Sequence, residues 1–212
     1  MKKSEVLSKL REQKIVVVVR GDTKEEGINA AIACIQGGIK SLEVAYTNNH
    51  AGDIIKELYR LFINDNDVCI GAGTVLDAPT ARNAIMAGAH YIVSPSFNYD
   101  TAILCNRYTI PYIPGCMTIT EMVTAMEAGS EMIKLFPGSA FSPKYISAIK
   151  GPLPHVSLMI TGGINQDNIK EWFNAGADAI GIGGELNSLA GKGDFQKITE
   201  IAKQYTEIFN HK

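Results

Sequence analysis

The sequence has no apolar run that approaches the roughly 20 residues needed to cross a bilayer. Residues 1–14 also lack the apolar core of a signal peptide, and Val6, Leu7 and Leu10 are spaced instead as one face of a short helix. The formal net charge is only −2, which gives no reason to expect nucleic acid or an anionic membrane as a partner. These absences favour a cytoplasmic protein.

Metal-binding patterns are missing as well. The four cysteines form no CxxC pair, and the four histidines show no metal-ligand spacing. Buried or incidental reduced thiols are the favoured interpretation of the cysteines, with metal ligation as the weaker alternative. We therefore expect no bound metal. The residues concerned are Cys34, Cys69, Cys105 and Cys116, and His50, His90, His155 and His211.

What the chain does contain is a regular alternation of short apolar runs and longer amphipathic segments. Strands are predicted at residues 15–20, 41–45, 68–71, 90–94, 111–114, 132–136, 157–161 and 179–183. Helical patterns cover residues 24–36, 51–64, 78–87, 119–128 and 167–175. Eight strands, each followed by a helix, predict an α/β fold: a single (β/α)8 TIM barrel with an additional N-terminal helix. No linker interrupts the pattern, so residues 1–212 are expected to form one domain.

A short repeat supports this count of strands. A small residue followed by glycine precedes the second, fourth, sixth and eighth predicted strands, at residues 37–38, 87–88, 128–129 and 175–176. Each interval therefore spans two β/α units. Glycine at these points is expected to take the left-handed conformation that ends a helix and turns the chain into the next strand.

Two charged residues interrupt the apolar strands. Lys134 lies between Ile133 and Leu135, which suit the layer beneath the helices, so Lys134 is expected to point into the barrel. By the same alternation, Glu43 faces inward from the second strand. A partly desolvated lysine is more readily neutral, and a neutral amine attacks carbonyl groups to form a Schiff base. The carboxylate could then relay protons; the alternative is a purely structural ion pair.

Other polar and turn-forming residues follow the strands, at the end of a barrel where active sites lie. Arg20 ends the first strand and could bind a substrate carboxylate through its guanidinium group. Gly71-Ala-Gly-Thr74 offers a close backbone approach and a hydroxyl, although the segment could instead be a glycine-rich turn in which Thr74 caps a helix. Pro95 and the Pro114-Gly115 pair either shape the pocket or simply form turns.

Two glycine-rich segments are candidates for an anion site. Thr161-Gly162-Gly163 closes the seventh strand, and residues 181–184 (Gly-Ile-Gly-Gly) close the eighth, before a short helix predicted at 185–189. Barrels often bind phosphate through backbone N–H groups of these two loops. The glycines could equally serve tight turns alone.

Taken in order, these landmarks resemble the 2-keto-3-deoxy-6-phosphogluconate (KDPG) and 4-hydroxy-2-oxoglutarate (KHG) aldolase family. The similarity runs over nearly the whole chain. It rests on LEV at 42–44, GAGTV at 71–75, SP at 94–95, IPYIPG at 110–115, KLFP at 134–137, GP at 151–152 and TGGI at 161–164. One such motif would be weak, but their ordered set is strong.

The resemblance implies a class I aldolase that needs neither metal nor organic cofactor and is commonly a trimer. It implies that Lys134 forms an imine with the C2 carbonyl of a 2-keto acid and that Glu43 is the general acid and base. Thr74 would contact the keto-acid carboxylate. The residues expected to hold the distal phosphate are Thr161, Gly162, Gly163, Gly183 and Gly184.

Two positions depart from the family pattern. Many members carry an arginine four residues after the catalytic glutamate, where this chain has Thr47 in the expected pocket. We predict that Arg20 supplies the missing cation. Members often place a serine after the paired glycines, where this chain has Glu185, an acid that would repel a nearby phosphate unless it points away.

Three other functions are compatible with the same residues. The substrate could be an unphosphorylated 2-keto-3-deoxy sugar acid. Alternatively, a phosphate-binding barrel could be an epimerase or isomerase that uses Glu43 as its base, with only an electrostatic role for Lys134. Finally, the barrel could bind a metabolite without catalysis, although a complete set of nucleophile, base and carboxylate anchor argues against this.

Overall fold

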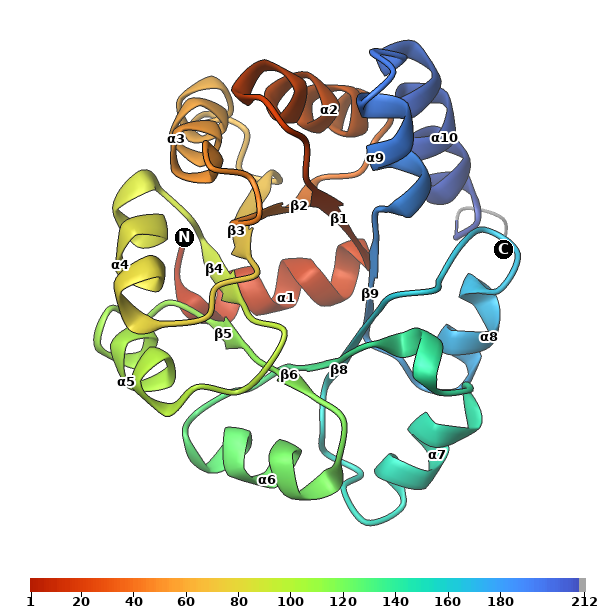
Figure 1. Ribbon diagram of the computed structural model, residues 1–212. Coiled ribbons are helices and arrows are strands. Elements are labelled where there is room, and N and C mark those ends of the chain that lie inside the picture. Colours follow the sequence, from red (N-terminus) through yellow and green to blue (C-terminus); the bar gives the residue numbers. More distant parts are fainter. Residues whose placement is uncertain (210–212) are drawn as a thin grey trace.

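The computed structural model describes residues 1–209, so His211 lies outside it. Parallel strands surround one axis and helices surround the strands (Figure 1). The strands are β1 (Ile15–Val19), β2 (Ser41–Ala45), β3 (Cys69–Gly73), β4 (Tyr91–Val93), β5 (Tyr112–Ile113), β6 (Gly115–Cys116), β7 (Ile133–Leu135), β8 (Leu158–Thr161) and β9 (Ala179–Ile182). Within the described residues they form one nine-stranded sheet.

The helices alternate with these strands as predicted. They are α1 (Lys3–Gln13), α2 (Lys24–Gln36), α3 (Ala51–Leu61), α4 (Ala78–Ala87), α5 (Tyr99–Arg107), α6 (Ile119–Glu127), α7 (Lys144–Lys150), α8 (Ile169–Asn174), α9 (Gly184–Ala190) and α10 (Phe195–Glu207). Helices α5 and α7 follow β4 and β7, as the predicted alternation requires, although no range was predicted for them, and α10 is an additional helix after α9. Among residues 1–209, no helix is both long and apolar enough to cross a bilayer.

The barrel closes through one interrupted strand. The sheet order runs from β5 through β4, β3, β2, β1, β9, β8 and β7 to β6. Strands β5 and β6 are consecutive in the chain and separated only by Pro114. The first pairs with β4 and the second with β7, so together they act as one strand that joins the two edges. The eight predicted barrel strands are therefore confirmed, with the fifth divided at a residue that lacks an N–H group.

The predicted glycine turns are also present. Gly38, Gly88, Gly129 and Gly176 all have positive φ, between +90° and +110°. Each lies between the end of a helix and the next barrel strand, three or four residues before the first residue of that strand, as the repeat indicated. A side chain with a Cβ atom rarely adopts this conformation, which explains why glycine recurs there.

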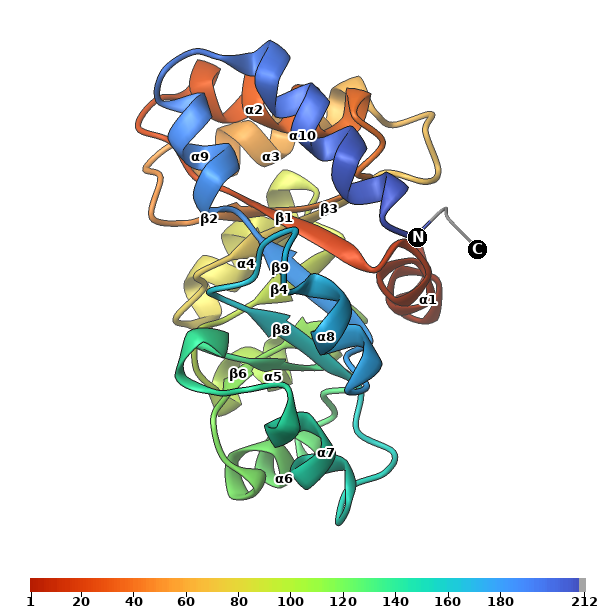
Figure 2. The ribbon, with the colours of Figure 1, turned by 90° about the vertical axis from the view of Figure 1, so that its right-hand side faces the viewer.

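Helix α1 closes the amino-terminal end of the barrel. Seen from the side, it lies across that end, opposite the loops that follow the strands (Figure 2). Its apolar residues Val6, Leu7 and Leu10 pack into one buried cluster with inward-facing strand residues such as Tyr91 and Met159. The bottom of the barrel is thus filled by side chains, so the interior of the barrel is open at the carboxyl ends of the strands.

Candidate active site

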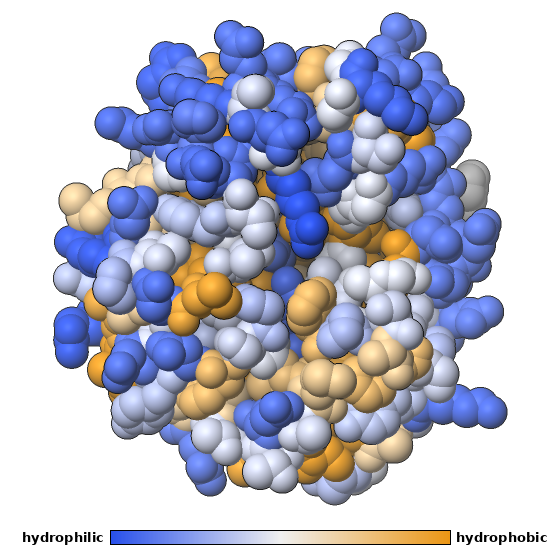
Figure 3. Space-filling view, viewed as in Figure 1, coloured by the Kyte–Doolittle hydropathy of each residue, from blue (hydrophilic) through white to orange (hydrophobic). Residues whose placement is uncertain are grey.

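A cavity of about 560 Å³ opens at the carboxyl ends of the strands. On this face, hydrophilic and hydrophobic residues adjoin around the barrel axis (Figure 3). Almost every residue predicted from the sequence lines the cavity: Arg20, Glu43, Thr74, Pro95, Lys134, Thr161, Gly162, Gly163, Gly183 and Gly184. Thr47 is the exception, because it is exposed and is not among the lining residues.

Lys134 and Glu43 meet at the base of this cavity. The Lys134 Nζ and Glu43 Oε1 atoms are 3.3 Å apart, and the two side chains are only 6% and 1% exposed. Their neighbours in the strands point outward into the layer beneath the helices, as the alternation predicted. The second carboxylate oxygen, Glu43 Oε2, is buried and accepts no hydrogen bond from any residue in 1–209. The pair thus retains acceptor capacity on the carboxylate, next to an amine that lines an open cavity.

Two glycines of β3 make room for this arrangement. A Cβ atom on Gly73 would lie 2.1 Å from Glu43 Oε1, so only glycine leaves space for the carboxylate. A Cβ atom on Gly71 would lie 2.3 Å from the ring of Tyr91, which fills the barrel one layer below. The Tyr91 hydroxyl donates to the Leu42 carbonyl oxygen at 2.7 Å, and burial raises the pKa of this phenol. The Gly-Ala-Gly segment therefore shapes the interior and does not form a turn.

Thr74 follows β3 directly and has a backbone conformation unusual for a residue with a side chain. Its φ is +54°, in the left-handed region that β-branched residues rarely occupy. The helix-capping alternative is wrong, because Asp77 caps α4 by accepting a hydrogen bond from the Thr80 N–H at 2.7 Å. Such strain persists only where surrounding structure fixes it, and it is common at binding sites.

Arg20 stands at the rim of the cavity, beyond the end of β1. Its side chain is exposed, and none of the ion pairs formed within residues 1–209 involves its guanidinium group. Arg20 is therefore a cation available to an anionic ligand. Pro95 is half-buried and also lines the cavity. Its backbone packs against Gly115, where an added Cβ would lie 2.1 Å from the Pro95 carbonyl oxygen.

The two glycine-rich loops form the wall beside Arg20, because they follow β8 and β9 and β9 pairs with β1. Gly162 and Gly163 have φ of +101° and +77°, which turns their backbone away from the strand direction. Gly184, at the start of α9, has open space where a side chain would be. The Thr161 hydroxyl is buried and, among the described residues, has no hydrogen-bond partner. These loops present backbone and one free hydroxyl to the cavity, while exposed Glu185 also lines it.

Sequence reasoning missed several lining residues, of which three are polar or aromatic side chains with contacts that matter to the site. Phe136 places its ring 5.1 Å from Lys134 Nζ, and Tyr205 reaches the cavity from α10, where burial raises its pKa to about 12. Asn187, in α9, makes three side-chain hydrogen bonds around the end of β1. Phe136 stands in the same motif as Lys134 and could have been considered. Tyr205 and Asn187 carry no local signal, since their roles depend on helices that pack from distant parts of the chain.

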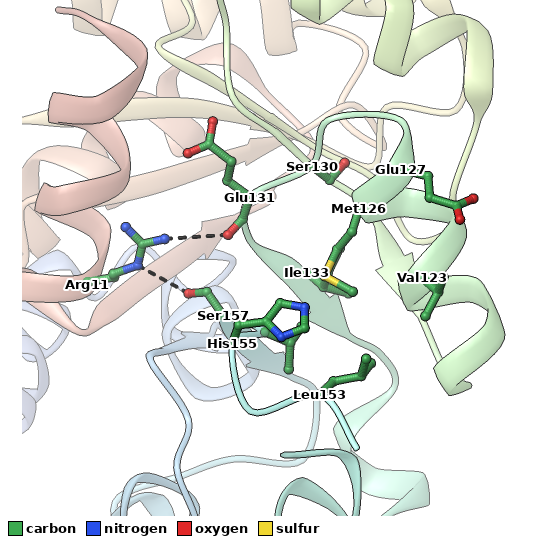
Figure 4. Close-up of a pocket in the computed structure, with 11 residues that line it drawn as sticks. Arg11, Val123, Met126, Glu127, Ser130, Glu131, Ile133, Leu153, His155 and Ser157 are labelled. Carbon is green, nitrogen blue, oxygen red and sulfur yellow. Dashed lines mark hydrogen bonds between the residues drawn. The ribbon is translucent and has the colours of Figure 1, made fainter. Parts of the chain in front are cut away.

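A second hollow, of about 510 Å³, lies at the amino-terminal ends of β7 and β8. His155, Ile133 and Met126 line it, while Arg11 hydrogen-bonds Ser157 and the Glu131 carbonyl on its far side (Figure 4). It brings together no buried nucleophile and base, so the cavity above Lys134 is the candidate active site. Within residues 1–209, no three His, Cys, Asp or Glu side chains are grouped to hold a metal ion.

Known proteins with similar sequences include several aldolases of one family. The family described as KDPG and KHG aldolase matches residues 6–201. A 2-dehydro-3-deoxy-6-phosphogalactonate aldolase of Escherichia coli K12 is 31% identical over 81% of this chain and 83% of its own. A 2-dehydro-3-deoxy-phosphogluconate aldolase of Treponema pallidum is 32% identical over 96% and 97%.

The same similarity holds in three dimensions. The crystal structure of a KDPG aldolase from Legionella pneumophila superposes with a TM-score of 0.84 at 26% identity, over 96% of this chain and 97% of that one. That structure captured pyruvate at low pH as a covalent carbinolamine intermediate.

Proposed function

This chain belongs to the KDPG and KHG aldolase family, and from that premise we propose that it cleaves a 2-keto acid through an imine on Lys134. It is an aldolase, a carbon–carbon lyase. The observation that supports Lys134 as the nucleophile is its buried position 3.3 Å from Glu43 at the base of an open cavity. An amine and a carboxylate so placed can exchange protons directly.

The reaction begins with attack of the Lys134 amine on the C2 carbonyl of the substrate. The resulting carbinolamine loses one water molecule to give a protonated imine, with Glu43 as the group that moves the protons. Glu43 Oε2, which is buried without a partner among the described residues, is free to accept a hydrogen bond from a substrate hydroxyl. The carboxylate is thus available at the step where a proton must leave the substrate.

Cleavage follows from the electron demand of the imine. When Glu43 removes the proton of the C4 hydroxyl, directly or through water, the C3–C4 bond breaks and its electrons pass to the imine nitrogen. The aldehyde leaves and an enamine stays on Lys134. Protonation at C3 and addition of one water then release pyruvate and restore the amine. The water lost on imine formation is thereby balanced by the water consumed on release.

Binding of the substrate rests on the two ends of the cavity. We propose that Arg20 and Thr74 hold the keto-acid carboxylate and that Gly162, Gly163, Gly183 and Gly184 hold the distal phosphate through backbone N–H groups. Thr161 and Pro95 border the substrate between these ends. Thr47 points to solvent and has no place in this arrangement.

The proposed substrates are 2-keto-3-deoxy-6-phosphogluconate, which yields pyruvate and glyceraldehyde 3-phosphate, and 4-hydroxy-2-oxoglutarate, which yields pyruvate and glyoxylate. Release of pyruvate is measured by coupling to lactate dehydrogenase. The assay compares these two compounds with 2-dehydro-3-deoxy-6-phosphogalactonate, after which one relative is named, and with unphosphorylated 2-keto-3-deoxygluconate. Faster turnover of the phosphorylated acids supports the glycine loops as a phosphate site, and equal turnover of phosphorylated and unphosphorylated acids contradicts it.

Assembly and location complete the proposal. We propose a homotrimer, because large apolar side chains remain exposed on neighbouring elements from α4 to α6, among them Met86, Tyr99, Ile103 and Ile119. Light scattering should then give three times the chain mass of 22.9 kDa. We propose the cytoplasm as location, because the four cysteines are free and buried, as expected in a reducing compartment.

A further inference from the structure

The end of β1 and the end of β9 separate just where both reach the cavity. Backbone pairing between the two strands runs from Ile15↔Ile180 to Val17↔Ile182. Beyond this pairing, the segment after β1 continues through Arg20 towards α2, and the segment after β9 enters α9 at Gly184. The separating segments carry Arg20 on one side and the Gly183–Gly184 pair on the other, and all three line the cavity.

One amide side chain bridges this gap. The Asn187 Nδ2 donates hydrogen bonds to the Val18 carbonyl oxygen at 2.8 Å and to the Gly183 carbonyl oxygen at 2.6 Å. Its Oδ1 accepts from the backbone N–H of Arg20 at 2.8 Å. The two donor hydrogens and the acceptor oxygen of the amide are therefore all engaged with backbone. These side-chain hydrogen bonds link the two segments beyond the point where backbone pairing between β1 and β9 ends.

The contact is tight enough to exclude other groups. A Cβ atom on Gly183 would lie 2.8 Å from the Val18 carbonyl oxygen and 2.9 Å from Asn187 Nδ2. Asn187 also donates its own backbone N–H to Gly183 at 2.8 Å, which fixes the first turn of α9 on the same residue. Aspartate has no donors for the two carbonyl oxygens, and leucine has neither donors nor acceptor, although both have nearly the size of asparagine.

We propose that Asn187 is a positioning residue, which fixes the backbone of Arg20 relative to the Gly183–Gly184 segment. This inference rests on the proposed function, in which Arg20 and the Gly183–Gly184 segment hold the two anionic groups of one substrate. A substrate that spans the cavity is bound well only if both parts keep their separation. Free pyruvate engages only the carboxylate end, so it depends less on that separation.

The test compares Asn187→Leu and Asn187→Asp with the wild-type enzyme. Both variants should raise the KM for 2-keto-3-deoxy-6-phosphogluconate between about ten-fold and about a hundred-fold, because small displacements of binding groups have effects of this size. The dissociation constant of pyruvate should change less. Asn187→Asp keeps an acceptor for the Arg20 N–H, so its pyruvate affinity should be nearer to wild type than that of Asn187→Leu.

A matched control lies on the same helix. Ser188 is exposed and is not among the cavity residues, so Ser188→Ala should leave both constants unchanged. Thermal unfolding of each variant shows whether the barrel is intact, and if Asn187→Leu does not fold, Asn187→Asp decides. A folded Asn187 variant whose KM stays within about two-fold of wild type overturns the inference. Absence of pyruvate release by the wild-type enzyme would instead overturn the proposed function, so the two failures are distinguishable.

Discussion

Gly73 is the most sensitive position near the reacting groups, because its missing side chain provides the space for the Glu43 carboxylate. In Gly73→Ala the new Cβ would lie 2.1 Å from Oε1, 2.5 Å from Cγ and 2.6 Å from Cδ of Glu43. The φ of Gly73 is not positive, so the alanine backbone itself is not strained. The carboxylate must therefore move, and with it the 3.3 Å contact to Lys134.

The expected loss follows from what the carboxylate does. Overpacking of a filled interior costs about 1–3 kcal/mol of stability. Loss of a positioned general acid and base lowers kcat by about 10² to 10⁴-fold. Gly73→Ala should therefore lower the free energy of unfolding moderately, as measured in urea, and lower kcat strongly in the coupled pyruvate assay. Gly151→Ala is the control, since the added Cβ there finds only ordinary contacts of 3.6 Å or more.

A double-mutant cycle separates this cause from general damage. Glu43→Ala removes the group that collides with the new methyl, so adding Gly73→Ala to Glu43→Ala should cost much less stability and activity than adding it to the wild type. Two results would refute the reasoning. One is a Gly73→Ala enzyme with kcat within two-fold of wild type; the other is strict additivity of the two substitutions.

Three further outcomes are expected. Arg20→Ala should weaken pyruvate binding about ten-fold or more in a direct titration, since it removes the rim cation, and unchanged affinity would reject Arg20 as the substitute for the missing family arginine. Tyr91→Phe should lower the free energy of unfolding, measured in urea, by about 1–2 kcal/mol, because it leaves the Leu42 carbonyl without its buried donor. The kcat should stay nearly unchanged, and a large fall in kcat would show instead that the phenol takes part in the reaction. Burial lowers the pKa of His90 from 6.5 to about 4. Between pH 6.5 and pH 4 the unfolded chain therefore binds more protons than the folded one, so the free energy of unfolding should fall as the pH drops through this range. In His90→Asn, whose side-chain oxygen can still accept from the Ile70 N–H, that part of the slope should vanish, and a wild-type slope in the variant would assign it to other groups.

The positions of Lys134 and Glu43 were predictable because strand alternation is a local property. Each charged residue stands between two apolar ones that pack beneath the helices, and the structure brings both into the interior. The repeated glycines before alternate strands were predictable for the same reason. These features depend on neighbours within a few residues, which a sequence displays directly.

Other features depend on contacts between distant segments. Gly71 and Gly73 suggest a turn by composition, but they lie in β3 because a tyrosine and a carboxylate from neighbouring strands need their space. Asn187 gains its role only when α9 returns to the end of β1. Thr47 was expected in the pocket from its spacing after Glu43, yet the chain leaves the barrel after Ala45 and exposes it. The assignment of residues 1–212 to one domain stays a prediction.

Covalent trapping on Lys134 tests the central claim most directly. The protein is incubated with pyruvate and borohydride, which reduces an imine to a stable amine, and the product is mapped by peptide mass spectrometry. Lys134→Met serves as the control. A pyruvate-derived adduct confined to the peptide that contains Lys134, and absent from the variant, is the predicted result. Folded protein that binds pyruvate but yields no adduct, or an adduct on another lysine, would contradict the account.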